Sequence, residues 1–485
     1  MRLRAALVQA AAALAATAAA QVPAGCIADR NYDRSVTVLD LLLVLGGFGA
    51  VAPSDGAAVG DISGDGIVDI ADVLLTLSSF GVTGCAPPVP VSAPGVAPSP
   101  GPTRPPPPPA WGAFAGGRVF GMGDNDDGRL GVGDSGNHHH SPVEAVGFGS
   151  DVVQIAAAGH VTFALRADGS VFASGLNDLG TLGDGTTSSR SSGAQITAIG
   201  TDTVELAQGL FSSMVVRKAD GTIAGWGNND MGELCLGNDE QQLTPLVITS
   251  LGSDNARIGS GCNHIFHMKT DGSVVGCGYN YWGNLGDGTY NRRTSPVPLP
   301  ALTGATQIVG GYAHTVALHA DGTVSTFGKN EYAQLGDGCV LNGRHQCTNF
   351  VLIPAVVQSL GSDNAMVGAG NRNSMVMKQD GRVFTVGYGW SGCLGVGDSD
   401  SDRASSSIFV QALVGSDNQA AVLSSNSHHI LVLKNDGTVA GWGSNGEGQL
   451  GSSPTGGQPA VITELSNDNY QLASQYHFSV VLKNT

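Results

Sequence analysis

The chain has 485 residues, with 23 basic and 40 acidic side chains and a formal net charge of −17. This acidic balance argues against nucleic acid or an anionic membrane surface as the partner. Glycines number 72 and aromatic residues make up only 6% of the chain, a composition typical of a fold with many tight turns.

The first twenty residues predict a secretory signal peptide. Arg2 and Arg4 precede an alanine-rich apolar run that ends in three alanines at residues 18–20. A disordered alanine-rich tail is the alternative interpretation. Pro23 stands where a lipidation motif ending at Cys26 needs an aliphatic residue, and no later segment has the ~20 apolar residues of a membrane span. We therefore expect a secreted, soluble mature protein.

Residues 26–85 contain two acidic twelve-residue loops, at 29–40 and 61–72, each followed by an apolar run. Oxygen-bearing residues at alternate loop positions match a calcium loop that leads into a helix, because Ca²⁺ takes about six to eight oxygen ligands. The predicted calcium ligands are Asp61, Ser63, Asp65, Ile67 (through its carbonyl), Asp69 and Asp72 in one loop, and Asp29, Asn31, Asp33, Ser35, Thr37 and Asp40 in the other.

The second of these loops is the stronger calcium site. In the first loop Arg34 occupies the position of the glycine that makes the sharp turn, so we expect weaker binding there. Solvated acidic turns without an ion are the alternative for both. The duplicated loops resemble a dockerin-type module, which implies calcium-dependent docking onto a cohesin-like receptor. A Cys26–Cys85 bridge would fasten the ends of so small a module.

Residues 86–110 form a proline-rich linker. Prolines fix φ and lack an amide donor, so this segment predicts an extended, semi-rigid spacer. The linker separates the predicted calcium module from everything that follows.

From residue 111 to residue 485 one sequence unit recurs at intervals of roughly fifty residues, which identifies a repeat architecture. In each unit an alternating apolar run leads to an Asp-Gly pair and a second short run follows, as around Asp271 and Gly272. This pattern predicts a hairpin with a two-residue turn that has positive φ at both positions. Leu285, between the later glycines, is the expected inward anchor. The seven copies begin at Gly117, Asp168, Asp220, Asp271, Asp321, Asp380 and Asp436.

Seven four-stranded units packed radially would bury apolar faces that one hairpin leaves open, which predicts an all-β, seven-bladed propeller beside the small helical calcium module. Residues 476–485 match the strand that precedes the Asp-Gly turn in the other copies, and no such turn follows them. The first copy begins at Gly117, with the part of the repeat that comes after this strand. We therefore expect one blade to be assembled from both ends of the repeat region, which removes open edge strands.

The repeat, with Asp-Gly-x-Val, Gly-x-Asn-x-x-Gly-x-Leu-Gly-x-Gly and a preceding Gly-x-x-His as at Gly311 to His314, resembles the regulator of chromosome condensation family. The resemblance implies the same seven-bladed fold. Two copies depart from the pattern, with Gly389 in place of the asparagine and Ala333 in place of a glycine. The family's founding activity, guanine-nucleotide exchange on the Ran GTPase, is one alternative function, although the predicted signal peptide opposes it.

No catalytic motif emerges from the sequence, and we expect a binding protein that is not an enzyme. His264, His314 and His429 share one repeat position, which favours a hydrogen-bonded role between strands over chemistry. The triple histidine at 138–140 favours a solvated loop over a metal site. Trp226 and Trp442 lie within strand patterns and are expected in the core. Among the eight cysteines, Cys339 and Cys347 bracket an insertion that a disulfide would staple, and the pairing of Cys235, Cys262, Cys277 and Cys393 stays open.

The residues that follow the repeat asparagine are expected in exposed loops. In copies four to six they include aromatics, whereas copies one and two carry Asp126, Asp127 and Asp178. Tyrosine and tryptophan are the usual anchors of protein and carbohydrate ligands, and packing between blades is the alternative. The predicted partner-binding residues are Tyr281, Trp282, Tyr332 and Trp390.

The sequence thus favours a secreted, monomeric, non-enzymatic propeller that recognises a protein or glycan and is tethered through calcium. A further alternative is a part of an extracellular polysaccharide-degrading assembly, since dockerin modules often accompany hydrolases.

Overall fold

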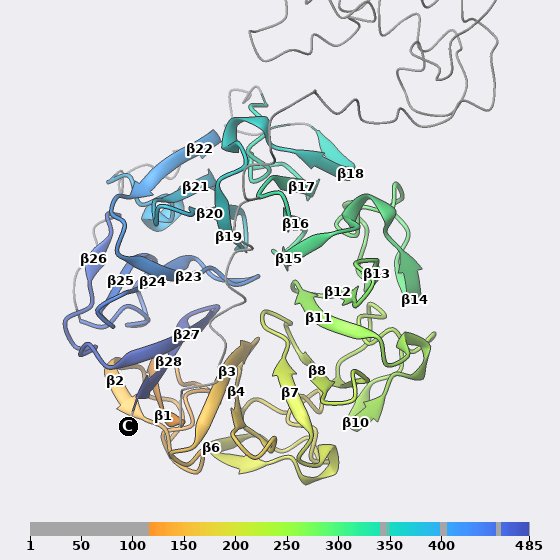
Figure 1. The fold of residues 1–485 in the computed structure, drawn as a ribbon. Helices are drawn as coiled ribbons and strands as arrows, with labels where there is room; N and C mark the ends of the chain where they lie inside the picture. The colour runs from red at the N-terminus through yellow and green to blue at the C-terminus, as the bar shows by residue number, and fades with distance from the viewer. Residues whose placement is uncertain (1–115, 340–346, 348, 398–404, 453–456, 485) are drawn as a thin grey trace, which may run out of the picture. The chain divides into compact units, whose positions relative to one another are not determined.

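A computed structural model describes residues 116–484 apart from 340–346, 348, 398–404 and 453–456. Figure 1 shows that its strands form a ring. Their pairing gives seven blades of four antiparallel strands each, and in two places a single residue pairing joins neighbouring blades into a sheet of eight strands. The all-β propeller predicted from the repeats is confirmed. The helical calcium module predicted for residues 26–85 lies outside the described residues.

The strands are named here from the centre of the ring to its rim. Blade 1 holds β27 (Asn469–Gln475), β28 (Phe478–Asn484), β1 (Gly117–Gly123) and β2 (His139–Glu144). Blade 2 holds β3 (Val152–Ala158), β4 (Val161–Arg166), β5 (Val171–Gly175) and β6 (Arg190–Gln195), and blade 3 holds β7 (Thr203–Leu206), β8 (Ser213–Lys218), β9 (Ile223–Gly227) and β10 (Gln242–Val247). Blade 4 holds β11 (Asn255–Ser260), β12 (His264–Lys269), β13 (Val274–Gly278) and β14 (Arg293–Pro298).

Blades 5 to 7 complete the ring. Blade 5 holds β15 (Ala305–Gly310), β16 (His314–His319), β17 (Val324–Lys329) and β18 (Phe350–Val356). Blade 6 holds β19 (Asn364–Ala369), β20 (Asn373–Lys378), β21 (Val383–Tyr388) and β22 (Ser405–Leu413), and blade 7 holds β23 (Asn418–Val422), β24 (His429–Lys434), β25 (Val439–Gly443) and β26 (Ala460–Val461).

Blade 1 closes the ring with strands from both ends of the repeat region. β28 pairs with β1 over its whole length, from Gly117 opposite Asn484 to Gly123 opposite Phe478. This is the shared blade that the interrupted repeat at the end of the chain predicted. Because the last and first strands hydrogen-bond to each other, neither is left as an open edge.

The Asp-Gly turns differ from the prediction in their backbone geometry. Gly272 has a φ of +84°, but Asp271 does not have positive φ. The amide of Gly272 donates to the carbonyl of Lys269 at 3.0 Å, and a carboxylate oxygen of Asp271 accepts the amide of Ser273 at 2.8 Å. The turn is therefore one residue longer than expected and ends in a left-handed glycine, because the aspartate side chain caps the next amide. Equivalent caps follow Asp168, Asp220, Asp321, Asp380 and Asp436.

The loop after the third strand of each blade is held by the repeat asparagine. In blade 4 the side-chain oxygen of Asn280 accepts the amide of Leu285 at 2.9 Å, and its amide group donates to the carbonyl of Thr289 at 3.1 Å. Asn280 and Leu285 are fully buried, so the leucine is the inward anchor that the sequence predicted. Where Gly389 replaces the asparagine, the short helix η5 (Trp390–Gly392) forms instead.

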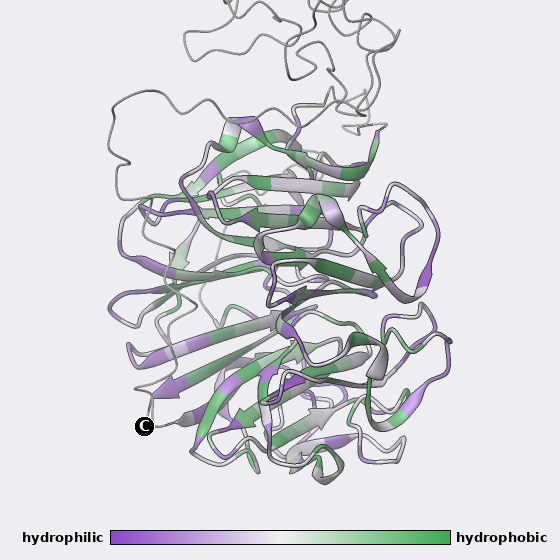
Figure 2. Ribbon diagram, turned by 45° about the vertical axis from the view of Figure 1, so that its right-hand side comes forward, coloured by the Kyte–Doolittle hydropathy of each residue, from purple (hydrophilic) through white to green (hydrophobic). Residues whose placement is uncertain are grey.

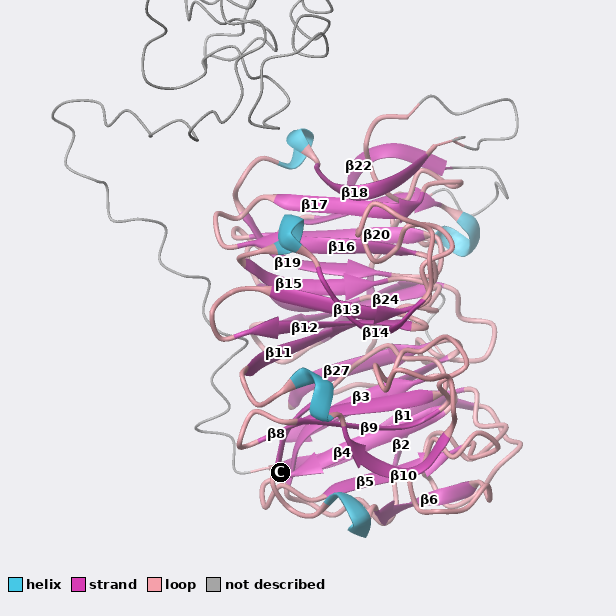
Figure 3. Ribbon diagram, turned by 90° about the vertical axis from the view of Figure 1, so that its right-hand side faces the viewer, coloured by secondary structure: helices cyan, strands magenta, loops and turns pink. Residues whose placement is uncertain are grey.

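Successive antiparallel strands place the connections of every blade on two opposite faces of the ring. The connections between first and second strands and between third and fourth strands share one face, here called the loop face. The Asp-Gly turns lie on the other. In the side view of Figure 3, η5 stands at the edge opposite the remaining short helices. Those four helices are η1 (Thr197–Ile199), η2 (Thr249–Leu251), η3 (Pro300–Leu302) and η4 (Gln358–Leu360).

Apolar side chains fill the blades and the spaces between them, and Figure 2 shows hydrophobic colour along the strands and hydrophilic colour in many connections. Trp226 and Trp442 are fully buried, as predicted. The indole of Trp226 donates to the carbonyl of Thr181 in the preceding blade at 2.8 Å. A disulfide joins Cys235 to Cys277 in the next blade, which binds the chain across a second blade boundary. Over the described part of the chain, no helix is long and apolar enough to cross a membrane.

Candidate functional site

The loop face carries a cavity of about 440 Å³, within the usual range of ligand sites. The cavity is lined by connections of blades 3 to 7 and blade 1, so residues far apart in sequence meet there. The lining combines aromatic rings, side-chain amides and two cations. The lining residues are Phe211, Cys262, Asn263, Tyr312, Ala313, Lys329, Tyr332, Gln334, Asn371, Arg372, Asn426 and Tyr476.

The aromatic arc, defined as Tyr281, Trp282, Tyr332 and Trp390, lies in the connections between third and fourth strands on this face. Tyr281 and Trp390 are exposed, at 54% and 39%. Trp282 and Tyr332 are half-buried. Only Tyr332 reaches the wall of the cavity, so the cavity and the arc overlap at that one residue.

Each member of the arc contacts another ring. Tyr281 packs against Tyr279 of its own connection, with ring centroids 5.1 Å apart. Trp282, Tyr332 and Trp390 contact Phe350, Tyr388 and His428 of the next blade, with ring centroids 5.3, 4.9 and 5.6 Å apart. The half-buried members therefore pack between blades, while Tyr281 and Trp390 present open ring surface to solvent.

The acidic arc, defined as Asp124, Asp126, Asp127 and Asp178, occupies blades 1 and 2. The buried Arg129 donates to Asp124 at 2.7 Å and to Asp127 at 2.8 Å, and a ring nitrogen of His160 lies 3.1 Å from Asp127. Asp124 and Asp127 are thus paired with the buried arginine. Asp126 and Asp178 remain exposed.

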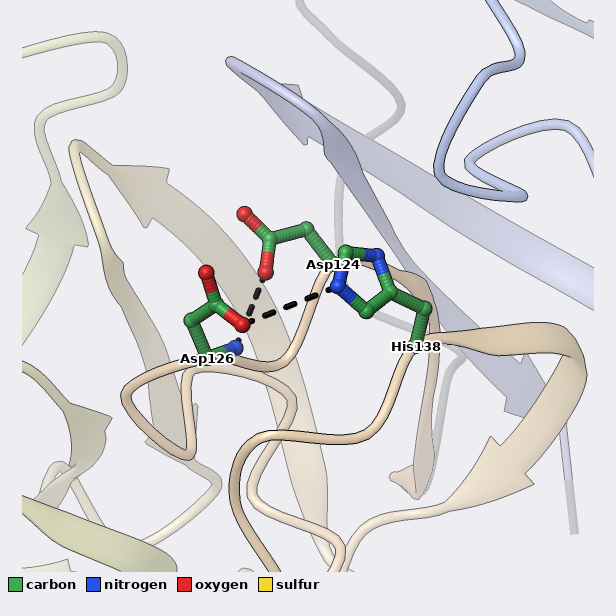
Figure 4. Close-up of side chains that lie close together, drawn as sticks. All are labelled: Asp124, Asp126 and His138. Atoms are coloured by element: carbon green, nitrogen blue, oxygen red, sulfur yellow. Dashed lines mark hydrogen bonds and ion pairs between the residues drawn. The ribbon is translucent and has the colours of Figure 1, made fainter.

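Figure 4 shows Asp124, Asp126 and His138 close together, and their ligand atoms lie within 4.8 Å of one another. Both oxygens of Asp124 are already engaged, one with the amide of Asp126 at 2.9 Å and the other with Arg129. His138 contacts Glu447 of blade 7 at 2.6 Å and Asp126 at 3.6 Å. Contacts within the protein thus engage Asp124 and His138, while the carboxylate of Asp126 stays exposed.

The triple histidine at 138–140 does not converge on one point. His138 contacts Glu447, whereas His139 begins β2 and lies 3.2 Å from Asp134. His138 lies in the connection, as the predicted solvated loop requires, but His139 and His140 belong to β2, so the loop prediction is wrong for these two.

The three repeat histidines form hydrogen bonds between strands, as their equivalent positions predicted, and in each case the partner lies in the next blade. Their Nε2 atoms lie 3.0 Å from the hydroxyl of Thr315 for His264 and 2.9 Å from that of Ser374 for His314, and the third, His429, lies 2.8 Å from Ser479. All three histidines are fully buried, and burial lowers the pKa of each to about 3. They stay neutral at physiological pH and serve as structural hydrogen-bond partners.

Glu233 is a buried acid at the repeat position that Gln334 and Gln449 hold in other blades. Its carboxylate accepts the amide of Met231 at 3.0 Å, as the two glutamines accept the amide two residues before them. Burial raises the pKa of Glu233 to about 7. The site therefore favours the protonated acid, which has the shape of glutamine.

Of the remaining predicted residues, some lie within the described part of the chain and others lie outside it. A disulfide joins Cys339 to Cys347, and Cys262 and Cys393 are free and buried. The calcium ligands and the pair Cys26 and Cys85 lie outside the described residues. The repeat pattern did not predict Arg372. It lies in the segment that corresponds to Gly-x-x-His in other copies, and among the copies only this segment contains an arginine.

Comparisons with known proteins agree with this fold. The RCC1-like domain family matches residues 115–422, and the regulator of chromosome condensation (RCC1) repeat matches residues 423–449. The ultraviolet-B receptor UVR8 of Arabidopsis thaliana is 29% identical over 361 residues, which cover 72% of this chain and 78% of the receptor. The E3 ubiquitin-protein ligase HERC2 of Mus musculus is 29% identical over 73% of this chain, but the match spans only 7% of the ligase.

Solved structures show the same architecture. Prp20p from Saccharomyces cerevisiae, described with its binding properties to Gsp1p and histones, superposes with a TM-score of 0.65 at 20% identity, covering 76% of this chain and 91% of that chain. Yeast RCC1 (Prp20) in a structure with bound Kap60 gives a TM-score of 0.66 at 19% identity, covering 82% and 97%.

Proposed function

Because the chain belongs to the RCC1-like domain family, we propose that its propeller is a protein-binding module whose contact surface is the loop face. The observation that carries the proposal is the cavity of about 440 Å³, on the same face as the exposed rings of Tyr281 and Trp390. Large rings with little conformational entropy are the anchors most often found at protein interfaces.

The relatives support a protein partner. Prp20p is described with Gsp1p, histones and Kap60 as binding partners, and UVR8 and HERC2 are a receptor and a ligase. Those partners belong to those proteins. What we infer for this chain is the mode of action, in which a rigid ring presents loops to another protein.

The location and tether of the module are further proposals that rest on the sequence alone. We infer that the signal peptide directs export and that the calcium loops at 29–40 and 61–72 dock the protein onto a cohesin-like receptor through Ca²⁺. Chelation with EDTA should then release the protein from its receptor, and Asp65→Ala should do the same without affecting the propeller.

The propeller proposal is tested by affinity capture from the native extracellular fraction with three forms of the full chain. These are the wild type, the double variant Tyr281→Ala, Trp390→Ala, and the control Val414→Ser, which changes a residue with 71% exposure. A captured protein is then purified, and its direct binding to each form is measured. We expect the double variant to lose binding and the control to retain it. Direct binding of equal strength by all three forms would place the contact surface elsewhere.

A further inference from the structure

Arg372 is set apart by its lack of an ionic partner. The described residues include ten arginines and six lysines, and fourteen of these sixteen cations lie within ion-pair distance of a carboxylate. Of the other two, Arg257 donates to the carbonyl of Thr306 at 3.0 Å. Within the same residues, Arg372 alone has neither a carboxylate nor a carbonyl partner.

Two tyrosines hold Arg372 at the wall of the cavity. The guanidinium lies 4.5 Å from the ring centroid of Tyr332 and 5.7 Å from that of Tyr388. Tyr332 comes from blade 5 and Tyr388 from blade 6, so the cation is fixed at a blade boundary. Stacked aromatic rings stabilise the face of a guanidinium and leave the N–H groups in its plane available. The donors of Arg372 are therefore left for a ligand.

Amide side chains share the lining of the cavity with this cation. Asn263, Asn371, Asn426 and Gln334 all line it, and the amide of Asn371 donates to the side-chain oxygen of Asn426. Side-chain amides both donate and accept, which suits the backbone of an extended peptide. An arginine next to them adds a fork that matches a carboxylate in a two-bonded arrangement.

We propose that the cavity binds a short protein segment through an aspartate or glutamate side chain that pairs with Arg372. This inference rests on the proposed protein-binding function and names the chemistry of its ligand. Tyr332 and Tyr388 orient the guanidinium, and the amides hold the peptide backbone on either side.

The charges of the loop face favour a peptide over an acidic polysaccharide. The exposed Asp126 and Asp178 lie on the same face, and the whole chain carries a net charge of −17. The charges of a polyanion that do not contact Arg372 would be repelled by the negative charge of the protein. A peptide avoids the repulsion because one acidic residue at Arg372 is compatible with neutral or basic residues elsewhere.

The test is selection of a phage-displayed library of random linear peptides on the full-length protein. Selected peptides are synthesised with their acidic residue intact or changed to the matching amide. Their affinities are measured by fluorescence polarisation for the wild type, Arg372→Gln, Arg372→Lys and the control Arg118→Gln. The control removes the same charge at an exposed ion pair with Glu144. Oligogalacturonate is titrated in parallel as an acidic glycan.

We expect the peptides to share one acidic position, and the amide peptide and Arg372→Gln each to lose roughly tenfold or more in affinity. Arg372→Lys should lie between, because a lysine keeps the charge without the fork. Arg118→Gln should match the wild type. An unchanged unfolding temperature of Arg372→Gln verifies that its loss of affinity is local. If this variant misfolds, the affinities of the amide peptide for the wild type and of the acidic peptide for Arg372→Lys test the inference instead.

Two results overturn the inference in distinguishable ways. Peptides that bind the wild type equally well as acid or amide, and that Arg372→Gln still binds, refute the role of Arg372 but leave the protein-binding function intact. Binding of oligogalacturonate that depends on Arg372, with no peptide selected, refutes both the peptide ligand and the proposed function.

Discussion

Asp126, Asp127 and Asp178 of the acidic arc follow the repeat asparagine as the members of the aromatic arc do, yet the side chains of the two arcs have different partners. In the acidic arc a buried arginine, Arg129, neutralises Asp124 and Asp127. Beside the aromatic arc, Arg372 stacks on Tyr332 and Tyr388 and has no carboxylate partner among the described residues. The loop face thus holds one arginine that is neutralised inside the protein and one whose guanidinium is available to a partner, and their ionic contacts distinguish the two.

The largest effect is expected from removing the cation beneath the acidic arc. Arg129→Gln leaves the paired carboxylates of Asp124 and Asp127 without their cation, and breaking a buried ion pair costs about 3 kcal/mol or more. Arg372→Gln should change stability by less than about 1 kcal/mol, because this residue is exposed. The two variants are compared by thermal unfolding monitored through tryptophan fluorescence. This signal reports on the repeat region, because all five tryptophans follow residue 110. Equal losses in both variants would contradict the distinction between the arcs.

The next effect is expected in blade 3, between the two arcs, where Glu233→Gln should stabilise the protein. The folded-state pKa of Glu233 is raised from 4.5 to about 7, so its contribution is fully present below pH 4.5 and is lost as pH rises to about 7. A glutamine has no charge to bury. The variant should match the wild type near pH 4 and exceed it by up to about 3 kcal/mol above pH 7.

Unfolding midpoints of Glu233→Gln and the wild type across this pH range provide the measurement. The exposed Glu144→Gln is the matched control, with no expected change in the difference curve. A constant difference between pH 4 and pH 8 would show that Glu233 does not titrate in the folded protein.

The repeat pattern was sufficient to predict the blades but not the site. Spacing alone placed Leu285 inward, the histidines between strands and the last strand beside the first, because each of these follows from a period repeated seven times. The carboxylate cap of the Asp-Gly turn escaped prediction because the turn type depends on which side chain satisfies the next amide. The Cys235–Cys277 disulfide and the stacking of Arg372 on Tyr332 and Tyr388 join different blades, so no local pattern encodes them.

A smaller effect is expected within the aromatic arc itself. Trp282→Ala removes a ring that packs on Phe350 and lies 4.6 Å below the ammonium of Lys329, at a cost of about 1–2 kcal/mol. Tyr281→Ala should cost less than about 0.5 kcal/mol, because Tyr281 is 54% exposed. The same unfolding measurement separates the two. A larger loss for Tyr281→Ala would mean that the exposed ring is structural, and its assignment to a partner would fail.

The smallest effect is expected at the edge of the acidic arc. His138→Gln breaks partly exposed contacts with Glu447 and Asp126, and such pairs contribute about 0.5 kcal/mol or less. Added Zn²⁺ should shift the unfolding temperature of the wild type and the variant equally, since Asp124 is already engaged by Arg129 and by the amide of Asp126. A zinc-dependent stabilisation present in the wild type and lost in His138→Gln would instead identify a metal site there. The acidic arc would then hold a ligand of its own, and the contrast with the aromatic arc would become one between two binding sites.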